Sequence, residues 1–163
     1  MGSSSATDRV RAALAEHDLS VEILEFPEST RTAAEAAHAV GATVAQIVKS
    51  LLFIADERPV LVLASGANRV DLKKLAGLVG ASRVEKATAE ITRALTGFSI
   101  GAVPPVGHPT VLPVVLDETL LQHRVVYAAA GTPHAVFAID PHALVRATGG
   151  AVVNIAEVPS GGD

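Results

Sequence analysis

Residues 46–55 form a long apolar run that contains a single charged residue, Lys49. The run, Gln-Ile-Val-Lys-Ser-Leu-Leu-Phe-Ile-Ala, has the composition and the length of a β-strand. Burying a lysine in such a strand is costly unless a partner or an anionic ligand meets its ammonium group. Because the chain has only four lysines, we expect this one to serve a ligand.

The pattern of the run leaves two interpretations of Lys49 open. Alternate side chains of a strand share a face, so Lys49 lies on the same face as Ile47 and Leu51. An apolar face favours a lysine that reaches from a lined pocket. The alternative is an edge strand whose lysine stands in water, which is a common way to prevent pairing between sheet edges.

The composition limits the class of protein. A chain of 163 residues with 49% hydrophobic and 18% charged residues predicts one folded domain with a real core. No apolar run approaches the ~18 residues that cross a membrane, and the polar start does not resemble a secretory signal. The absence of cysteine excludes disulfides and a thiolate nucleophile and is compatible with the cytoplasm. The net charge of −4 argues against DNA or other non-specific nucleic-acid binding and leaves local RNA recognition open.

Strand patterns outnumber helix patterns along the chain. The expected strands are the segments 21–26, 46–55, 60–64, 111–116, 124–129, 134–139 and 151–155. The expected helices are the segments 7–18, 32–40 and 71–78 and two short helices that begin at Thr88 and Pro141. We therefore predict an α+β fold with a curved, mixed, mainly antiparallel and barrel-like sheet and helices packed outside. Residues 7–158 are expected to form a single domain between flexible tails at 1–6 and 159–163.

Local signals predict several helix ends. Thr7 or Asp8 is expected to cap the first helix, and Thr32 begins the second with a capping box. In the helix that begins at Thr88, Ile91 and Leu95 are expected on the buried face.

Two glycine-containing segments are candidates for ligand binding. Residues 97–107 hold three glycines and two prolines, so Gly101 would let the backbone approach a ligand while the prolines fix the shape of the loop. Backbone N–H groups of such a loop can bind a carbonyl or phosphate oxygen. The second segment is the turn 131–134, which ends at His134. The alternatives are an ordinary tight connection and a histidine that bonds a nearby carbonyl group.

Basic residues are concentrated between positions 69 and 93, whereas the rest of the chain is acidic. Arg69, Lys73 and Lys74 are therefore candidates to contact the phosphate backbone of a nucleic acid, with a solvated helix face as the alternative. The six histidines show no metal-binding spacing, and the chain has no Walker A, dinucleotide or nucleophile-elbow motif. We expect no metal and no cofactor.

Four segments in order along the chain carry a family resemblance. They are Val48-Lys49-Ser50-Leu51-Leu52 ahead of an apolar hairpin, Val70 to Leu75, Gly97 to Gly107, and Gly131-Thr132-Pro133-His134. Together they resemble the YbaK family, over nearly the whole chain from about Val10 to Ile155. That family includes free-standing aminoacyl-tRNA deacylases and the editing domain inserted in bacterial prolyl-tRNA synthetases.

The resemblance implies a single α+β domain that needs no metal, and it implies a set of site residues. The lysine of the family falls on Lys49, its G-x-x-x-P loop on Gly101 to Pro105, and its glycine–histidine turn on Gly131 and His134. The implied catalytic residues are Lys49, Gly101 and His134. The implied substrate-binding residues are Phe26, Thr30, Ser99, Ala102, Pro105 and Gly131. Many relatives have Gly-Gly-x-Ser-Pro in the loop where this chain has Gly-Ala-Val-Pro-Pro, a difference that can alter the size of the pocket.

The implied function is hydrolysis of the ester of a mischarged tRNA, with tRNA(Pro) carrying alanine or cysteine as the expected substrate. Prolyl-tRNA synthetase or an elongation factor is a candidate protein partner. Lys49 is expected to bind the terminal phosphate, backbone N–H groups near Gly101 to stabilise the oxyanion, and His134 to orient the α-amino group or a water. Two alternatives stay open: a non-catalytic tRNA- or protein-binding regulatory module of the same fold, and hydrolysis of a small aminoacyl compound.

Overall fold

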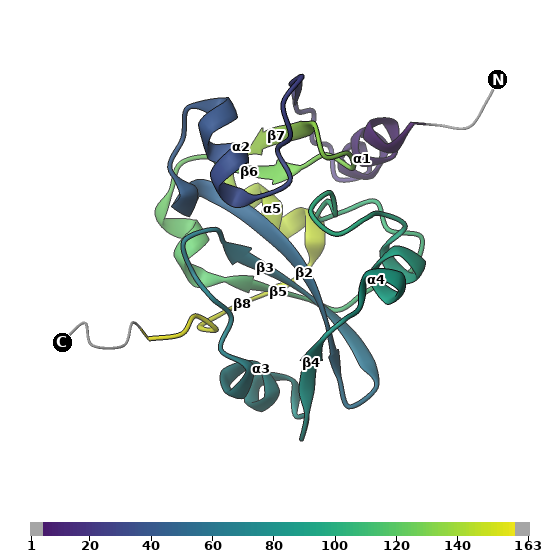
Figure 1. The fold of residues 1–163 in the computed structure, drawn as a ribbon, viewed down its shortest axis with the longest axis vertical. Coiled ribbons are helices and arrows are strands. Elements are labelled where there is room, and N and C mark those ends of the chain that lie inside the picture. The colour runs from purple at the N-terminus through teal and green to yellow at the C-terminus, as the bar shows by residue number, and fades with distance from the viewer. Residues whose placement is uncertain (1–4, 159–163) are drawn as a thin grey trace.

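A computed structural model describes residues 5–158 of the chain. Residues 1–4 and 159–163, which belong to the two predicted tails, lie outside the described residues. Within residues 5–158, no helix is both long enough and apolar enough to cross a bilayer. One mixed sheet runs through the molecule, and the helices lie around it (Figure 1).

The described residues form five α-helices, two 3-10 helices and eight strands. The helices are α1 (Ala6–Ala15), α2 (Ala33–Val40), η1 (Val44–Gln46), α3 (Leu72–Val79), α4 (Ala89–Thr96), η2 (Glu118–Gln122) and α5 (Pro141–Thr148). The strands are β1 (Ile23–Glu25), β2 (Ile47–Ala55), β3 (Arg58–Ser65), β4 (Val84–Lys86), β5 (Val114–Asp117), β6 (Val126–Ala129), β7 (Ala135–Ile139) and β8 (Ala151–Val153). The predicted α+β fold is confirmed. No pattern in the sequence indicated β4, which is three residues long and mostly exposed.

The strands are ordered β1-β7-β6-β2-β3-β5-β8, and β4 pairs with β2 outside this path. Strands β2 and β3 form the predicted antiparallel hairpin, paired from Val48 with Ser65 to Ala55 with Arg58. Pairing is also antiparallel between β1 and β7, β6 and β7, and β2 and β4. It is parallel between β2 and β6, β3 and β5, and β5 and β8. The expectation of a mixed, mainly antiparallel sheet is therefore confirmed.

Strand β2 lies inside the sheet, so the edge-strand interpretation of Lys49 is wrong. One side of β2 is paired with β3 along nearly its whole length. The other side pairs with β6 through Ile47 and Val48 and with β4 from Phe53 to Ala55. Between these two short pairings, residues 49–51 have no partner strand on that side within the described chain. The sheet thus opens locally beside Lys49.

Both faces of β2 are apolar, which explains why the strand is central. Val48 and Leu52 belong to a large core that also contains Phe137. Phe53, on the other face, belongs to a second core that includes Leu75 of α3. A strand buried on both sides has a near-continuous apolar sequence, and this is the pattern that residues 46–55 show.

The local helix signals were partly correct. Thr32 caps α2 and Glu35 completes the expected capping box. The first helix begins earlier than predicted, because Ser5 is its N-cap and Asp8 closes that capping box from the third helical position. The predicted buried face of α4 was correct for Leu95, which is half-buried and packs against the core, and wrong for Ile91, which is 39% exposed, while Thr92 is buried.

The 97–107 loop is fixed at its start by a buried threonine. The hydroxyl oxygen of Thr96 lies 2.6 Å from the carbonyl oxygen of Thr92 and accepts the N–H of Phe98 at 3.1 Å. Further along, Nε2 of His108 lies 2.7 Å from the carbonyl oxygen of Pro104, which can only accept, so this nitrogen donates. Burial lowers the pKa of His108, in keeping with a neutral ring.

Replacing Thr96 by valine removes the hydroxyl while nearly keeping its volume. Because the N–H of Phe98 would be left unpaired in a buried place, the free energy of unfolding should fall by about 1–3 kcal/mol. The fall can be measured by urea unfolding followed by far-ultraviolet circular dichroism.

Thr148→Val is the matched control, since Thr148 is also the last residue of a helix and precedes a left-handed glycine. Its hydroxyl donates to the carbonyl of Leu144 at 3.0 Å but is only half-buried. A loss of stability in Thr148→Val as large as that in Thr96→Val would contradict the conclusion that the buried hydroxyl of Thr96 fixes the start of the loop.

Candidate functional site

A cavity of about 440 Å³ lies where β2 lacks a partner strand. Residues before and within α2, the 97–107 loop and strand β6 supply its other walls. Most of the lining is apolar, including Ala36, Val48, Val103 and Val136. Its volume is within the range of pockets that hold small ligands, and its apolar walls with few polar groups are typical of such pockets.

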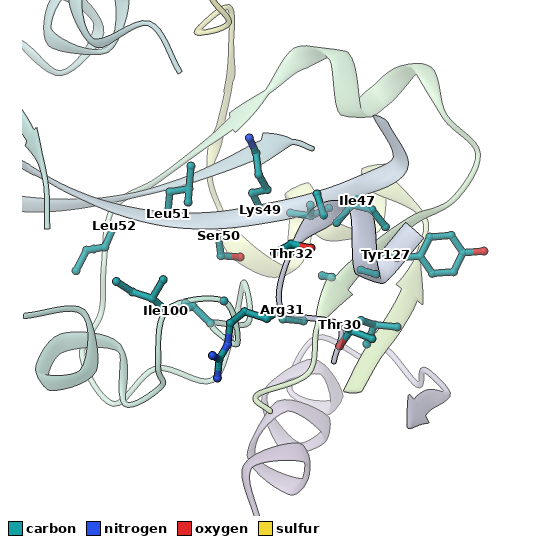
Figure 2. Close-up of a pocket in the computed structure, with 18 of the residues that line it drawn as sticks. Thr30, Arg31, Thr32, Ile47, Lys49, Ser50, Leu51, Leu52, Ile100 and Tyr127 are labelled. Carbon is teal, nitrogen blue, oxygen red and sulfur yellow. The ribbon is translucent and has the colours of Figure 1, made fainter. Parts of the chain in front are cut away.

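Lys49 lines this cavity and is half-buried. Its ammonium nitrogen donates to the backbone carbonyl of Asn68 at 2.7 Å. Figure 2 shows that Lys49 and Ser50 extend from opposite sides of β2. The ammonium group therefore lies across the strand from the part of the cavity that Ser50 faces. Since an ammonium group has three donors, two are left for an anion.

Several charges act on the Lys49 ammonium. Burial lowers the pKa of Lys49, the carboxylate of Asp117 opposes this fall, and the nearby cations Lys86 and Arg69 reinforce it. Lys86 also lines the cavity. The site thus has the excess positive charge that an anionic ligand would offset.

Ser50 was not among the residues expected in the site. Its side chain points toward Ile100 and Arg31 in Figure 2, and it lines the cavity. Among the described residues, its hydroxyl is a buried side-chain polar atom without a hydrogen-bond partner. Such a group is costly to bury, so it is a candidate to bond a ligand. The signal in the sequence was its position next to Lys49 in an otherwise apolar strand.

Gly101 lies in the cavity wall and has a positive φ of +86°. A Cβ atom at this position would collide with the side chain of Arg31, so the close approach of Arg31 requires glycine. No described residue accepts a hydrogen bond from the N–H of Gly101. Arg31 also lines the cavity and was not predicted as a site residue, because it meets the loop only in the fold.

The other loop residues that were expected to bind substrate support the loop and do not line the cavity. Ser99 accepts a hydrogen bond from Arg93 at 3.0 Å, and its carbonyl accepts the N–H of Ala102 at 2.9 Å. Ala102 and Pro105 belong to the loop and are buried.

Thr30 connects the cavity to the 131–134 turn. It is buried, lines the cavity, and donates both its N–H and its hydroxyl to the carbonyl of Pro133, at 2.6 and 3.2 Å. The ring of His134 is exposed outside the cavity lining, and its Nδ1 lies 2.9 Å from the carbonyl oxygen of Glu28. Gly131 has a φ of +98° and packs against Phe98 rather than against the cavity.

Phe26 lies beside this turn. Its N–H donates to the carbonyl of His134 at 2.9 Å. Its side chain lines a second, more open hollow together with Glu28 and His38. The structure thus brings Lys49, Gly101 and Thr30 to one cavity and leaves Phe26 and His134 on the adjoining surface.

The expected nucleic-acid contacts differ in their surroundings. Arg69 and Lys73 are exposed. Lys74 is half-buried and donates to the carbonyl of Ala156 at 2.8 Å, so it holds the C-terminal segment in place. Over residues 5–158, no group of three or more histidine and carboxylate side chains is arranged to hold a metal ion.

Comparisons with known proteins agree on one family. The family model for the aminoacyl-tRNA editing domain matches residues 27–147. A solved structure provisionally described as a trans-editing enzyme for prolyl tRNA synthetase superimposes with a TM-score of 0.89 and 49% sequence identity, over 96% of this chain and 100% of that one. A protein of Enterococcus faecalis, provisionally named Cys-tRNA(Pro)/Cys-tRNA(Cys) deacylase EbsC, is 27% identical over 86% of this chain and 87% of its own.

A second group of relatives consists of much larger proteins. The proline–tRNA ligase of Latilactobacillus sakei is 40% identical over 75 residues, which are 46% of this chain and 13% of the ligase. The chain therefore spans only a small part of the ligases that it matches. The range matched by the family model contains β2, the 97–107 loop and the 131–134 turn. Since that range covers most of the chain, this protein belongs to the aminoacyl-tRNA editing domain family, the YbaK family that its motifs resemble.

Proposed function

We propose that this protein is a trans-editing deacylase that hydrolyses the ester of mischarged tRNA, with tRNA(Pro) carrying alanine or cysteine as its substrate. The main support is the apolar cavity, which has Lys49 at its edge and Gly101 in its wall, and the N–H of Gly101 has no acceptor among the described residues. The names of the relatives, a trans-editing enzyme and a tRNA(Pro) deacylase, point to the same chemistry.

The reaction needs no strong nucleophile from the protein, because an aminoacyl ester is already activated. The oxygen of a water, held in place by the site or by a ribose hydroxyl of the substrate, attacks the carbonyl carbon, and the bond to the ribose oxygen breaks. When water attacks, the free amino acid leaves and the ribose oxygen takes up a proton. Holding these groups in place can supply much of the rate. The N–H of Gly101 stabilises the negative charge that develops on the carbonyl oxygen.

The opening in the sheet gives the substrate a path past β2. The amino acid enters the cavity on the Ser50 side, and the terminal phosphate meets the two remaining donors of Lys49 on the other side. The edge of the strand at residues 49–51 then lies between the two ends of the substrate. His134 contributes from the adjoining turn, which Thr30 ties to the cavity, by orienting the α-amino group or a water.

The cavity selects its amino acid by size. Its lining carries small or branched apolar side chains, such as Ala36, Val103 and Val136. Apolar contacts separate amino acids that differ by one methylene by only about 1–3 kcal/mol. A second, smaller cavity that tests the product of a synthetase improves on that limit, which is the purpose of an editing site.

The substrate is tested with tRNA(Pro) charged separately with alanine, cysteine, serine and proline. We expect the wild type to release alanine or cysteine, and Lys49→Ala to reduce kcat/KM by at least about tenfold because the phosphate loses its cation. Loss of radiolabelled amino acid from the tRNA measures the rate. A wild type that releases none of the four would contradict the enzyme proposal, and tRNA binding without hydrolysis would favour a regulatory binding module.

Ser50→Ala separates a ligand-binding hydroxyl from a structural one. Because the hydroxyl has no partner among the described residues, its removal should leave the free energy of unfolding unchanged or raise it by about 1 kcal/mol. Deacylation should nevertheless slow, because the substrate loses a hydrogen bond. Urea unfolding and the charged-tRNA assay measure the two effects.

Ser65→Ala is the control for Ser50→Ala, since Ser65 lies on the neighbouring strand and its hydroxyl donates to the carbonyl of Ala45 at 2.8 Å. The Ser65→Ala substitution should lower the free energy of unfolding by about 1 kcal/mol. A Ser50→Ala protein that is as destabilised as Ser65→Ala and fully active would show that the hydroxyl does not serve a ligand.

The proposed tRNA-binding side chains are tested by the salt dependence of binding. Replacing exposed Lys73 or Arg69 by alanine should weaken binding of tRNA(Pro) and reduce the slope of log K against log salt by about 1 for each phosphate that is no longer neutralised. Lys74→Ala should chiefly lower stability, because Lys74 already binds Ala156. Filter binding at several salt concentrations measures the slopes, and unchanged slopes for Lys73→Ala and Arg69→Ala would rule out a role of these side chains in tRNA binding.

If the substrate is of this kind, the protein acts in the cytoplasm, where charged tRNA is made and used. Prolyl-tRNA synthetase and the elongation factor are the partners that would hand over the tRNA. Hydrolysis of a small aminoacyl compound is the competing activity, and it would be insensitive to salt and to Lys73→Ala.

A further inference from the structure

Asp117 is a buried carboxylate outside the cavity, and only 1% of its surface is exposed. It is the last residue of β5, which runs parallel to β3 with Leu116 beside Leu63. The ends of the two strands therefore meet, which places Asp117 beside Ser65. A buried carboxylate is costly unless hydrogen bonds satisfy its oxygens.

Four hydrogen bonds satisfy this carboxylate, two on each oxygen. Oδ1 accepts the N–H and the hydroxyl of Thr119, at 3.0 and 2.8 Å. Oδ2 accepts the N–H of Ser65 at 3.1 Å and the side-chain amide of Asn68 at 2.8 Å. The first pair caps η2, which is a structural role. The bond to Asn68 has no such role in η2.

Asn68 joins the carboxylate to the lysine of the site. Its side-chain amide is held by both Asp117 and Thr119, the latter at 2.9 Å. Its own backbone carbonyl accepts the Lys49 ammonium at 2.7 Å. The turn after β3 is thus fixed from one side by a carboxylate and presents a carbonyl oxygen to the lysine on the other.

We propose that Asp117, acting through Asn68, is a positioning residue that holds the Lys49 ammonium group charged and in place at the edge of the cavity. The role of the charge in catalysis rests on the proposed deacylase function, whereas the hold on Lys49 does not. Asp117 touches no substrate, because it lies behind the turn.

The charges that face Lys49 show why such a residue is needed. Lys86 comes from β4 and Arg69 from the turn after β3, and both are positive. Together with burial they lower the pKa of Lys49, and Asp117 is the negative group that opposes them. Removing the charge of Asp117 therefore lowers this pKa further. The lysine then loses its charge at a lower pH, and any activity that needs the cation ends at a lower pH.

The direct test is the pKa of Lys49 in Asp117→Asn, measured by NMR on protein labelled with carbon-13 at lysine Cε. The chain has four lysines, so the spectrum is simple, and Lys49 is assigned from the signal that Lys49→Arg removes. We expect a lower pKa for Lys49 in Asp117→Asn than in the wild type. A folded Asp117→Asn protein with the pKa of the wild type would overturn the proposal.

Asp56→Asn is the matched control. Asp56 is also a carboxylate that accepts backbone N–H groups, those of Ser82 and Arg83 at 2.8 and 2.9 Å, but it lies in the turn at the far end of the β2–β3 hairpin. The Asp56→Asn substitution should leave the pKa of Lys49 unchanged. An equal shift in both variants would mean that any loosening of the hairpin moves this pKa, which also overturns the proposal.

Asn68→Ala keeps the test decisive if Asp117→Asn does not fold. It breaks the link while Asp117 retains the bonds to Ser65 and Thr119 and keeps its charge. The Lys49 signal should broaden or move, and kcat/KM on alanyl-tRNA(Pro) should fall by about tenfold because the lysine is misplaced. A folded Asn68→Ala protein with the Lys49 signal and the activity of the wild type would overturn the link.

The pH dependence of kcat/KM gives a second measure. After subtraction of the spontaneous loss of the ester, the alkaline limb should move to lower pH in Asp117→Asn and stay in place in Asp56→Asn. If the wild type hydrolyses no charged tRNA, the proposed function fails, and the NMR titration alone still decides whether Asp117 holds Lys49.

Discussion

The site depends on how strand β2 accommodates a lysine between two apolar cores. Val48 and Leu52 face one core and Phe53 faces the other, so neither side of the strand is open to bulk water over most of its length. The ammonium group of Lys49 is stable there because a carbonyl oxygen accepts it at 2.7 Å and a buried carboxylate lies behind that carbonyl group. Without the carboxylate, burial and two neighbouring cations would lower the pKa of Lys49 further.

The cavity follows from the same strand. β6 and β4 pair with the two ends of one side of β2 and leave residues 49–51 between them without a strand in the described part of the chain. The cavity lies at this opening, and the 97–107 loop and the residues before α2 close it. The opening also places the lysine next to the cavity, because both occupy the same three residues of β2.

Local chemistry made much of this fold predictable from the sequence. A threonine followed three residues later by a glutamate, as at Thr32 and Glu35, forms a capping box that predicts the start of a helix. The apolar run of β2, followed by the turn at 56–59 and a second apolar run, predicts a hairpin. The lysine stood out because its neighbours are apolar. The family motifs then named Gly101 and the 131–134 turn, and the structure brings Gly101 into the cavity wall while His134 lies outside it.

What the sequence did not show depends on contacts between distant segments. β4 is short and mostly exposed, and it is a strand because it pairs with β2. Arg31 becomes part of the site only because Gly101 lies against its side chain. Asp117 looks like the cap of a short helix, and its second role needs Asn68, which is 49 positions away in the chain. No local pattern reports a pairing of that kind.

Three features of the cavity wall differ in what they say about a ligand. A positive φ costs a glycine little and occurs at Gly131 as well as at Gly101, and burial lowers the pKa of His108 as well as that of Lys49, so neither feature alone marks a site. The Ser50 hydroxyl is different, because it is buried and has no partner among residues 5–158. Together with the two remaining donors of Lys49, it forms the set of polar groups that a ligand, rather than the protein, would complete.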